Sequence, residues 1–198
     1  MAVRFLLIRH GQTDWNLNKR YCGFIDVELN EEGRKQAARL GKRLRDEKVQ
    51  TIYASDRKRA VETAQIVFGG AAIEIHAGLR EINFGCFEGL SHAEIMERYH
   101  DVYTQWLHDP FNTVIPGGES LQDFRLRVVN AFYGIAGAYN DTTVAVVAHG
   151  GVLSMLINDV SKTNDFWGMI PGSASLTVIE FNGSQPRIQL LNDTSHLA

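Results

Sequence analysis

Residues 5–16 read FLLIRHGQTDWN, an apolar run that ends in Arg9 and His10 and continues through a glycine into small polar residues. The run predicts a buried strand that presents an arginine and a histidine side by side at its end. In open α/β sheets, ligands bind outside the carboxyl ends of the strands. A planar guanidinium at that place matches two oxygens of a phosphate or carboxylate. The adjacent imidazole can serve as a nucleophile or a proton carrier.

A second apolar run ends in the same way. Residues 143–148 read TVAVVA and lead into His149, Gly150 and Gly151. A lone histidine at a strand end has an equally good structural explanation. Two such histidines, one of them beside Arg9, favour a shared functional site at one edge of a sheet.

The composition is that of an ordinary globular domain. The chain has 198 residues, of which 44% are hydrophobic and 22% are charged, and this fits one domain with a sizeable core. The net charge of -3 gives no electrostatic reason to expect nucleic acid or an anionic membrane as a partner. Any anion must therefore be bound by local positive charge.

No segment indicates a membrane span or export. No apolar stretch approaches the ~20 residues that cross a bilayer, and the N-terminus lacks the basic and apolar regions of a leader. The two cysteines, Cys22 and Cys86, do not have the C-x-x-C spacing of a redox or zinc motif, so reduced thiols are expected. These features predict a cytoplasmic protein that does not associate with membranes.

Strand and helix patterns alternate along the chain, which predicts an α/β fold with a mostly parallel sheet. Strands are expected at 3–8, 49–54, 73–75, 143–148 and 175–181, with 187–191 as the hairpin partner of the last across the Asn182-Gly183 turn. Helices are expected after Asn30 and over 57–68, 93–99, 102–107, 120–139 and 151–159. We expect a single domain over 1–198, with a loop-and-helix cap at about 82–119.

Two further side chains complete the candidate site. Arg59 lies at the start of the helix that follows the second strand and would project toward the same sheet edge. Taken alone, such an arginine is more often part of a solvated basic patch. Glu81 lies in a loop with apolar neighbours, which would raise its pKa and let it keep a usable proton, although an isolated glutamate is more often simply exposed.

Arg9, His10, Arg59, Glu81 and His149 together suit phosphoryl transfer without a metal. The chain has neither a Walker-type glycine loop nor a carboxylate cluster for magnesium, so no metal and no cofactor are expected. Neutral His10 would attack phosphorus in line, while the two arginines and protonated His149 stabilise the equatorial oxygens. Glu81 would protonate the departing oxygen and then act as the base for hydrolysis of the phosphohistidine.

These motifs resemble the histidine phosphatase superfamily, which includes cofactor-dependent phosphoglycerate mutases and many phosphatases. The resemblance rests on residues 9–16, on SDRKRA at 55–60, on LRE at 79–81 and on VAHG at 147–150. A weaker match, LNDTSHL at 191–197, is similar to the tail of several members. The resemblance implies a three-layer αβα sandwich, mostly parallel with an antiparallel edge strand.

The resemblance also implies a role for each matching residue. His10 corresponds to the phosphorylated histidine and Glu81 to the proton donor. Arg9, Arg59 and His149 correspond to the phosphate pocket. The remaining candidates for binding the substrate are Thr13, Asn16, Cys22, Gly23 and Gly150.

The branch of the superfamily decides between hydrolysis and isomerisation. Residues 82–89, INFGCFEG, are similar to the phosphatase branch, and the insertion before PGGES at 116–120 is short, whereas mutases have a longer one. Phe84, Phe87 and Trp106 suggest a pocket of low polarity. We expect a phosphatase acting on a small-molecule phosphomonoester and resembling α-ribazole phosphatases, broad-specificity phosphatases or metal-independent phosphoserine phosphatases. A mutase is the alternative.

Two hypotheses from other functional classes stay open. A non-catalytic phosphate-binding module would keep Arg9 and Arg59 but commonly lose His10 or Glu81, and both are present here. A metallohydrolase would use His10, His149 and Glu81 as ligands, and activity in the presence of a strong chelator would exclude it. The sequence leaves the oligomeric state undecided, with a homodimer as one option.

Overall fold

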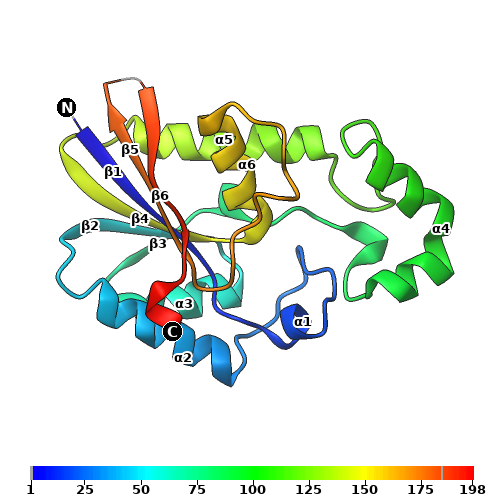
Figure 1. Ribbon diagram of the computed structural model, residues 1–198, viewed down its shortest axis with the longest axis horizontal. Coiled ribbons are helices and arrows are strands. Elements are labelled where there is room, and N and C mark those ends of the chain that lie inside the picture. Colours follow the sequence, from blue (N-terminus) through cyan, green and yellow to red (C-terminus); the bar gives the residue numbers. More distant parts are fainter. Residues whose placement is uncertain (1, 184) are drawn as a thin grey trace.

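A computed structural model describes residues 2–183 and 185–198 and has a six-stranded sheet at its centre (Figure 1). The strand order is β3-β2-β4-β1-β5-β6. Its strands are β1 (Ala2–Arg9), β2 (Val49–Ala54), β3 (Ile73–Ile75), β4 (Thr142–Ala148), β5 (Leu176–Asn182) and β6 (Gln185–Asp193). The two strands with terminal histidines, β1 and β4, are neighbours at the middle of the sheet, so their carboxyl ends open on the same edge.

The sheet is mostly parallel, and antiparallel pairing is confined to one side. β1, β2, β3 and β4 pair in parallel, whereas β5 is antiparallel to both β1 and β6. The predicted fold class is confirmed, and the hairpin expected across the Asn182-Gly183 turn forms the antiparallel side. Asn182 pairs with Gln185 across this hairpin, and Gly183 has a φ of 70°, a backbone conformation that favours glycine.

Helices cover both faces of the sheet and make the third layer that the resemblance implied. They are α1 (Asp14–Leu17), α2 (Glu31–Arg43), α3 (Lys58–Phe68), α4 (His92–His108), α5 (Leu121–Ala136) and α6 (Gly150–Ser161). Alternate residues of β1 point to opposite faces: Phe5 and Leu7 pack with α5 and α6, and Leu6 and Ile8 pack with α2 and α3. Figure 1 shows these helix pairs on opposite sides of the sheet.

The helix boundaries follow their capping residues. Asn30, Ser91 and Ser120 each accept a hydrogen bond from a backbone N–H of the first turn, as the sequence pattern predicted. The two short helices expected over 93–107 are one element, α4, with a kink at Tyr99. α1, a single turn that Thr13 caps, is not among the helices expected from the sequence.

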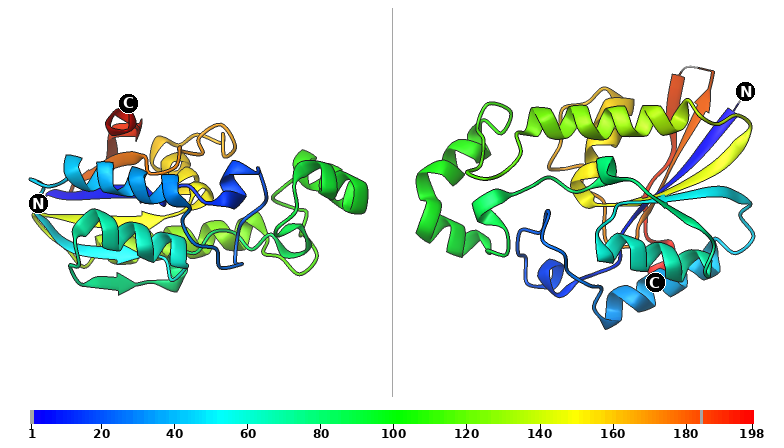
Figure 2. Two further views of the ribbon diagram at one scale, coloured as in Figure 1. Left: turned by 90° about the horizontal axis from the view of Figure 1, so that it is seen from below. Right: turned by 180° about the vertical axis from the view of Figure 1, so that it is seen from behind.

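The segment around α4 extends beyond the end of the sheet and contains a small core of its own (Figures 1 and 2). This core consists of Phe87, Ile95, Tyr103, Trp106 and Ile115, which are almost fully buried.

The segment that follows β1 is fixed to α2 by close backbone contact. A Cβ on Gly11 would come within 2.5 Å of the carbonyl oxygen of Gly33, so the crossing requires glycine. None of the helices in the described ranges has the length and apolarity to cross a membrane.

Candidate active site

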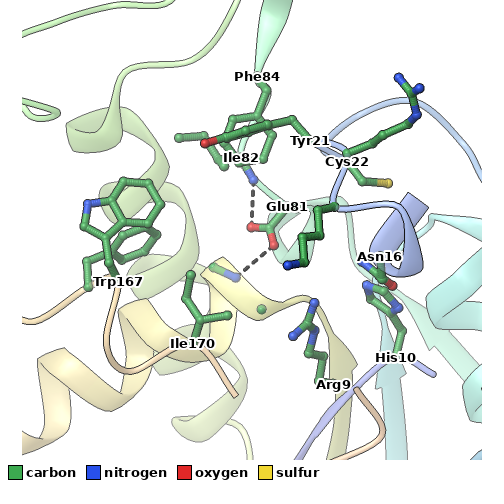
Figure 3. Close-up of a pocket in the computed structure, with 15 residues that line it drawn as sticks. Arg9, His10, Asn16, Tyr21, Cys22, Glu81, Ile82, Phe84, Trp167 and Ile170 are labelled. Carbon is green, nitrogen blue, oxygen red and sulfur yellow. Dashed lines mark hydrogen bonds between the residues drawn. The ribbon is translucent and has the colours of Figure 1, made fainter. Parts of the chain in front are cut away.

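Six of the residues predicted from sequence line one cavity of about 300 Å³ beyond the ends of β1 and β4 (Figure 3). Arg9 and His10 come from the end of β1, and Gly150 is the first residue of α6. Asn16 lies on α1, while Cys22 and Glu81 lie on two separate loops. The predicted site residues that line the cavity are Arg9, His10, Asn16, Cys22, Glu81 and Gly150.

His10 is held with one ring nitrogen free. Its Nδ1 lies 2.7 Å from the carbonyl oxygen of Gly11, which can only accept a hydrogen bond, so Nδ1 carries the proton and Nε2 keeps its lone pair. Burial, followed by the nearby positive charges of Arg59 and Arg9, lowers the pKa of His10 well below its ordinary value. The imidazole is therefore neutral at neutral pH, which is the form that can attack phosphorus.

Arg9 supplies a hydrogen-bond donor that the protein leaves unused. Its Nη1 donates to the carbonyl oxygen of Pro171. Its Nε is buried and has no hydrogen-bond partner among the residues that the structure describes. A buried donor without an acceptor is costly, so this group suits an anionic oxygen brought by a ligand.

Glu81 is buried, and its carboxylate is oriented by two backbone N–H groups. It accepts hydrogen bonds from the N–H of Ile82 at 3.0 Å and the N–H of Gly151 at 2.8 Å, drawn as dashed lines in Figure 3. Burial raises the pKa of Glu81, and the two backbone hydrogen bonds offset part of that effect. The carboxyl group is thus fixed at the cavity wall and retains a proton at a higher pH than an exposed glutamate does.

The two glycines at the start of α6 make this arrangement possible. A Cβ on Gly150 would lie 3.3 Å from the guanidinium carbon of Arg9, and one on Gly151 would lie 2.4 Å from Oε1 of Glu81. A side chain at Gly151 would therefore push the carboxyl group out of its position.

We expect Gly151→Ala to lower the turnover of alkyl phosphates by about 10–100-fold, because small misplacements of a reacting group carry costs of that size. Gly134→Ala is the matched control, since a Cβ on Gly134 in α5 would meet no atom within 4 Å. Steady-state rates of both variants on one alkyl phosphate check this. A Gly151→Ala enzyme as fast as Gly134→Ala would mean that the position of Glu81 is not critical.

Arg59 and His149 lie next to His10 but behind the residues that line the cavity. Arg59 is fully buried and donates to the carbonyl oxygens of Gly23 at 2.8 Å and Ile25 at 3.1 Å, and to Nδ1 of His149 at 3.2 Å. The rings of His149 and His10 meet edge to face, with centroids 5.2 Å apart. These two predicted residues therefore lie against His10 without lining the cavity.

The charge state expected for His149 differs from the one that its contacts favour. Its Nδ1 accepts from Arg59, so the ring proton is on Nε2, which donates to the hydroxyl of Ser55 at 2.8 Å. Burial, together with the positive charge of Arg59, lowers the pKa of His149 well below its ordinary value. His149 is neutral in this arrangement, whereas the sequence analysis assumed the protonated form.

The other predicted residues support the lining. Thr13 and Asn16 hydrogen-bond to each other around the cap of α1, with the Thr13 N–H donating to Asn16 Oδ1 at 3.0 Å. The carbonyl oxygen of Gly23 accepts a hydrogen bond from Arg59. A Cβ on Gly23 would lie 2.1 Å from the carbonyl oxygen of Ile82, so this position requires glycine. Burial raises the pKa of the Cys22 thiol to about 11, so Cys22 is a neutral thiol in the cavity wall.

Sequence reasoning missed part of the cavity wall. Phe84 lines the cavity as expected, but Phe87 and Trp106 belong to the core around α4 and do not line it. The adjacent basic pair at 19–20, shortly after the first motif, was a signal that could have been used. Residues 166–170 had no such signal, because they are distant in sequence from every motif of the site. The missed lining residues are Lys19, Arg20, Tyr21, Ile82, Gly151, Phe166, Trp167 and Ile170.

The chain is similar to several known proteins over nearly its whole length. The model of the histidine phosphatase superfamily (branch 1) matches residues 5–194. The chain is 34% identical to phosphoglycerate mutase-like protein 4 of Arabidopsis thaliana over 98% of its length and 87% of the relative. It is 33% identical to phosphoserine phosphatase 1 of Hydrogenobacter thermophilus over 98% of its length and 94% of the relative. The crystal structure of a putative α-ribazole-5'-P phosphatase from Escherichia coli is 27% identical and superposes with a TM-score of 0.92, covering 98% of each chain.

Proposed function

The chain belongs to branch 1 of the histidine phosphatase superfamily, and from this we propose that it hydrolyses small-molecule phosphomonoesters through a phosphohistidine formed on His10. One observation carries the proposal. The imidazole of His10, with its Nε2 unprotonated, lines the same cavity as a guanidinium that has an unused donor and a carboxyl group of raised pKa. A nucleophile, an anion-binding group and a proton donor are the three parts that phosphoryl transfer of this kind requires.

In the first step, His10 Nε2 attacks phosphorus, and the bond between phosphorus and the ester oxygen breaks. Glu81 gives its proton to that oxygen, so the alcohol leaves neutral. In the second step, water attacks the phosphohistidine and the bond between nitrogen and phosphorus breaks. Glu81, now a carboxylate, takes a proton from the water, which returns both groups to their starting states and releases orthophosphate.

The positive groups stabilise the transferring phosphoryl group. Arg9 would donate its free Nε–H to a phosphoryl oxygen. Arg59 would keep the pocket positive, and Arg59 and the neutral His149 would hold the ring of His10 in place. The Asn16 amide and the backbone at Gly150 lie at the same cavity and would bind further oxygens. Thr13 and Gly23 would act by holding Asn16 and Arg59, and Cys22 would contact the ester group.

The substrate is a phosphomonoester of a small alcohol. The names of the relatives point to phosphoserine and α-ribazole 5'-phosphate as candidates, and broad specificity is equally compatible with them. One relative is called mutase-like, but the segment at 82–89 and the short insertion before residue 116 support hydrolysis. We further propose that residues 1–198 act as one domain, with the segment at about 82–119 as a cap beside the cavity.

A metal-dependent reaction is the alternative from another class. The residues that the structure describes contain no group of three or more His, Cys, Asp or Glu side chains placed to hold a metal ion. The lowered pKa of His10 and the raised pKa of Glu81 instead favour the neutral imidazole and the protonated carboxyl group that a direct attack by imidazole needs.

We expect phosphate release from a panel of phosphomonoesters to continue unchanged in the presence of a strong chelator. With 3-phosphoglycerate and a bisphosphate primer, the enzyme should form little 2-phosphoglycerate. Colorimetric phosphate assays and chromatography of the phosphoglycerates measure the two activities. Loss of activity on chelation would overturn the proposed mechanism, and mutase turnover well above phosphatase turnover would overturn the assignment to hydrolysis.

A further inference from the structure

The C-terminal tail lies outside the cavity, yet it is built into the backbone that carries the candidate nucleophile. After β6, residues 195–197 form a short 3-10 turn that packs beside α2 (Figure 1). The tail sequence matched a family motif, but no step of the proposed mechanism uses it. The contacts of its histidine give it a role.

Arg43 at the end of α2 binds three residues of the C-terminal tail through its guanidinium. It forms an ion pair with Asp193, donates to the hydroxyl of Ser195 at 2.9 Å and lies 3.3 Å from Nδ1 of His196. The N–H of Ser195 donates to the carboxylate of Asp193 at 2.9 Å. We call Arg43, Asp193, Ser195 and His196 the C-terminal clasp.

His196 connects the clasp to the segment between α6 and β5. Its Nε2 lies 3.0 Å from the carbonyl oxygen of Ala174. A carbonyl can only accept and a guanidinium can only donate, so Nε2 carries the proton and Nδ1 accepts from Arg43. Both contacts of His196 therefore require the same neutral tautomer.

Ala174 continues the connection to the active site. Its N–H donates to the carbonyl oxygen of His10 at 3.1 Å. The carbonyl of the next residue, Ser175, accepts from the N–H of Arg9 at 3.2 Å. Ala174 has a φ of 52°, a left-handed conformation that alanine rarely adopts, so it must be held there by its surroundings.

We propose that His196 is a positioning residue, which fixes the backbone of His10 by way of Ala174 and so aligns the imidazole for attack. The inference rests on the proposed role of His10 as the nucleophile. Ala174 contacts the clasp through its C=O and His10 through its N–H, so loss of the contact with His196 frees a strained residue that directly supports His10.

Protonation of His196 should open the clasp. The charged groups that face its ring are Arg43 and Arg39 of α2 and Asp193 of β6, and burial lowers its pKa below the ordinary value. A proton on Nδ1 would replace the contact with Arg43 by repulsion. The clasp is therefore closed above this pKa and opens as the pH falls through it.

The test compares His196→Ala and His196→Gln with His100→Ala, an exposed histidine of α4. We expect His196→Ala to slow phosphoenzyme formation in a single turnover by about 10–100-fold, the range for a displaced reacting group. His196→Gln should restore most of the rate, because its amide can donate to Ala174 and accept from Arg43, and it should not respond to acid through this position. His100→Ala should match the natural enzyme. All rates are taken well below the unfolding temperature of each variant.

Nitrogen chemical shifts of the histidine rings give a second readout that does not depend on turnover. The natural protein should show His196 as the Nε2–H tautomer, and the His10 signals should move in His196→Ala and move back in His196→Gln. A His196→Ala enzyme that is phosphorylated at the natural rate, or His10 signals that do not respond to the substitution, would overturn the inference. If the natural enzyme forms no phosphohistidine at all, the proposed function is overturned instead, and the shifts still test the contact between the clasp and His10.

Discussion

Replacing His10 with alanine should abolish the phosphoenzyme and reduce phosphatase turnover by a factor on the order of 10⁴ or more, because it removes the atom that bonds to phosphorus. His10→Asn is the sharper variant. An asparagine amide can keep the hydrogen bond to the Gly11 carbonyl that Nδ1 makes, but it has no counterpart to Nε2. Both variants should be equally inactive, although His10→Asn should fold more stably.

Brief incubation with labelled substrate, followed by work-up that avoids acid, measures the phosphoenzyme, because phosphohistidine does not survive acid. His100→Ala again serves as the control and should keep both the label and the rate. Near-normal turnover in His10→Asn would show that the covalent mechanism is wrong and that water attacks the substrate directly.

Glu81→Gln should show a loss that depends on the leaving group. Removal of a general acid typically costs about 10²–10⁴ in rate. An alkoxide leaves poorly without a proton, whereas p-nitrophenolate departs readily, so alkyl phosphates should lose far more than p-nitrophenyl phosphate. Phosphoenzyme formation is the quantity to measure, since Glu81 also serves in the second step and slow dephosphorylation would hide the difference. Equal losses on both substrates would mean that Glu81 positions the phosphate or supports its loop and is not the acid.

The same variant should change the pH dependence. The acid form of Glu81 is needed in the first step, and burial raises its pKa. Phosphoenzyme formation from an alkyl phosphate should therefore fall as the pH rises through this raised pKa, and Glu81→Gln should lack that decline. At low pH the rate falls when His10 takes a proton, but its lowered pKa moves this limit toward acid. The two pKa shifts have opposite directions, so they bring the neutral form of His10 and the protonated form of Glu81 toward the same range of pH.

The sequence predicted the site well where it depends on strand ends. Arg9 and His10 follow an apolar run, and His149 follows another, so the parallel pairing of β1 with β4 brings them together without any detailed knowledge of packing. The fold class could be predicted for a similar reason, because alternating apolar periods and capping residues are local signals.

Features that depend on contacts distant in sequence could not be predicted. The neutral form of His149 follows from its contacts with Ser55, which comes directly after β2, and with Arg59, which lies in the first turn of α3. Trp167 and Ile170 reach the cavity because the segment after α6 folds back over it, and no local pattern encodes that path. The tail motif could be read as a resemblance, but its contact with Ala174 depends on how β6 ends beside α2.

The unused donor of Arg9 has a consequence for the lifetime of the protein. Arg9 is half-buried, with a buried Nε, and lies near the fully buried Arg59. Among the residues that the structure describes, neither arginine forms an ion pair with a carboxylate. An unliganded molecule thus carries uncompensated positive charge in its interior, which destabilises the native state. Orthophosphate, the product of the proposed reaction, would bind the native state and not the unfolded chain, so at 100 times its dissociation constant it would add about 2.7 kcal/mol of stability. Resistance to degradation would then rise with the concentration of orthophosphate. The enzyme would be degraded faster where phosphate is scarce than where its product accumulates.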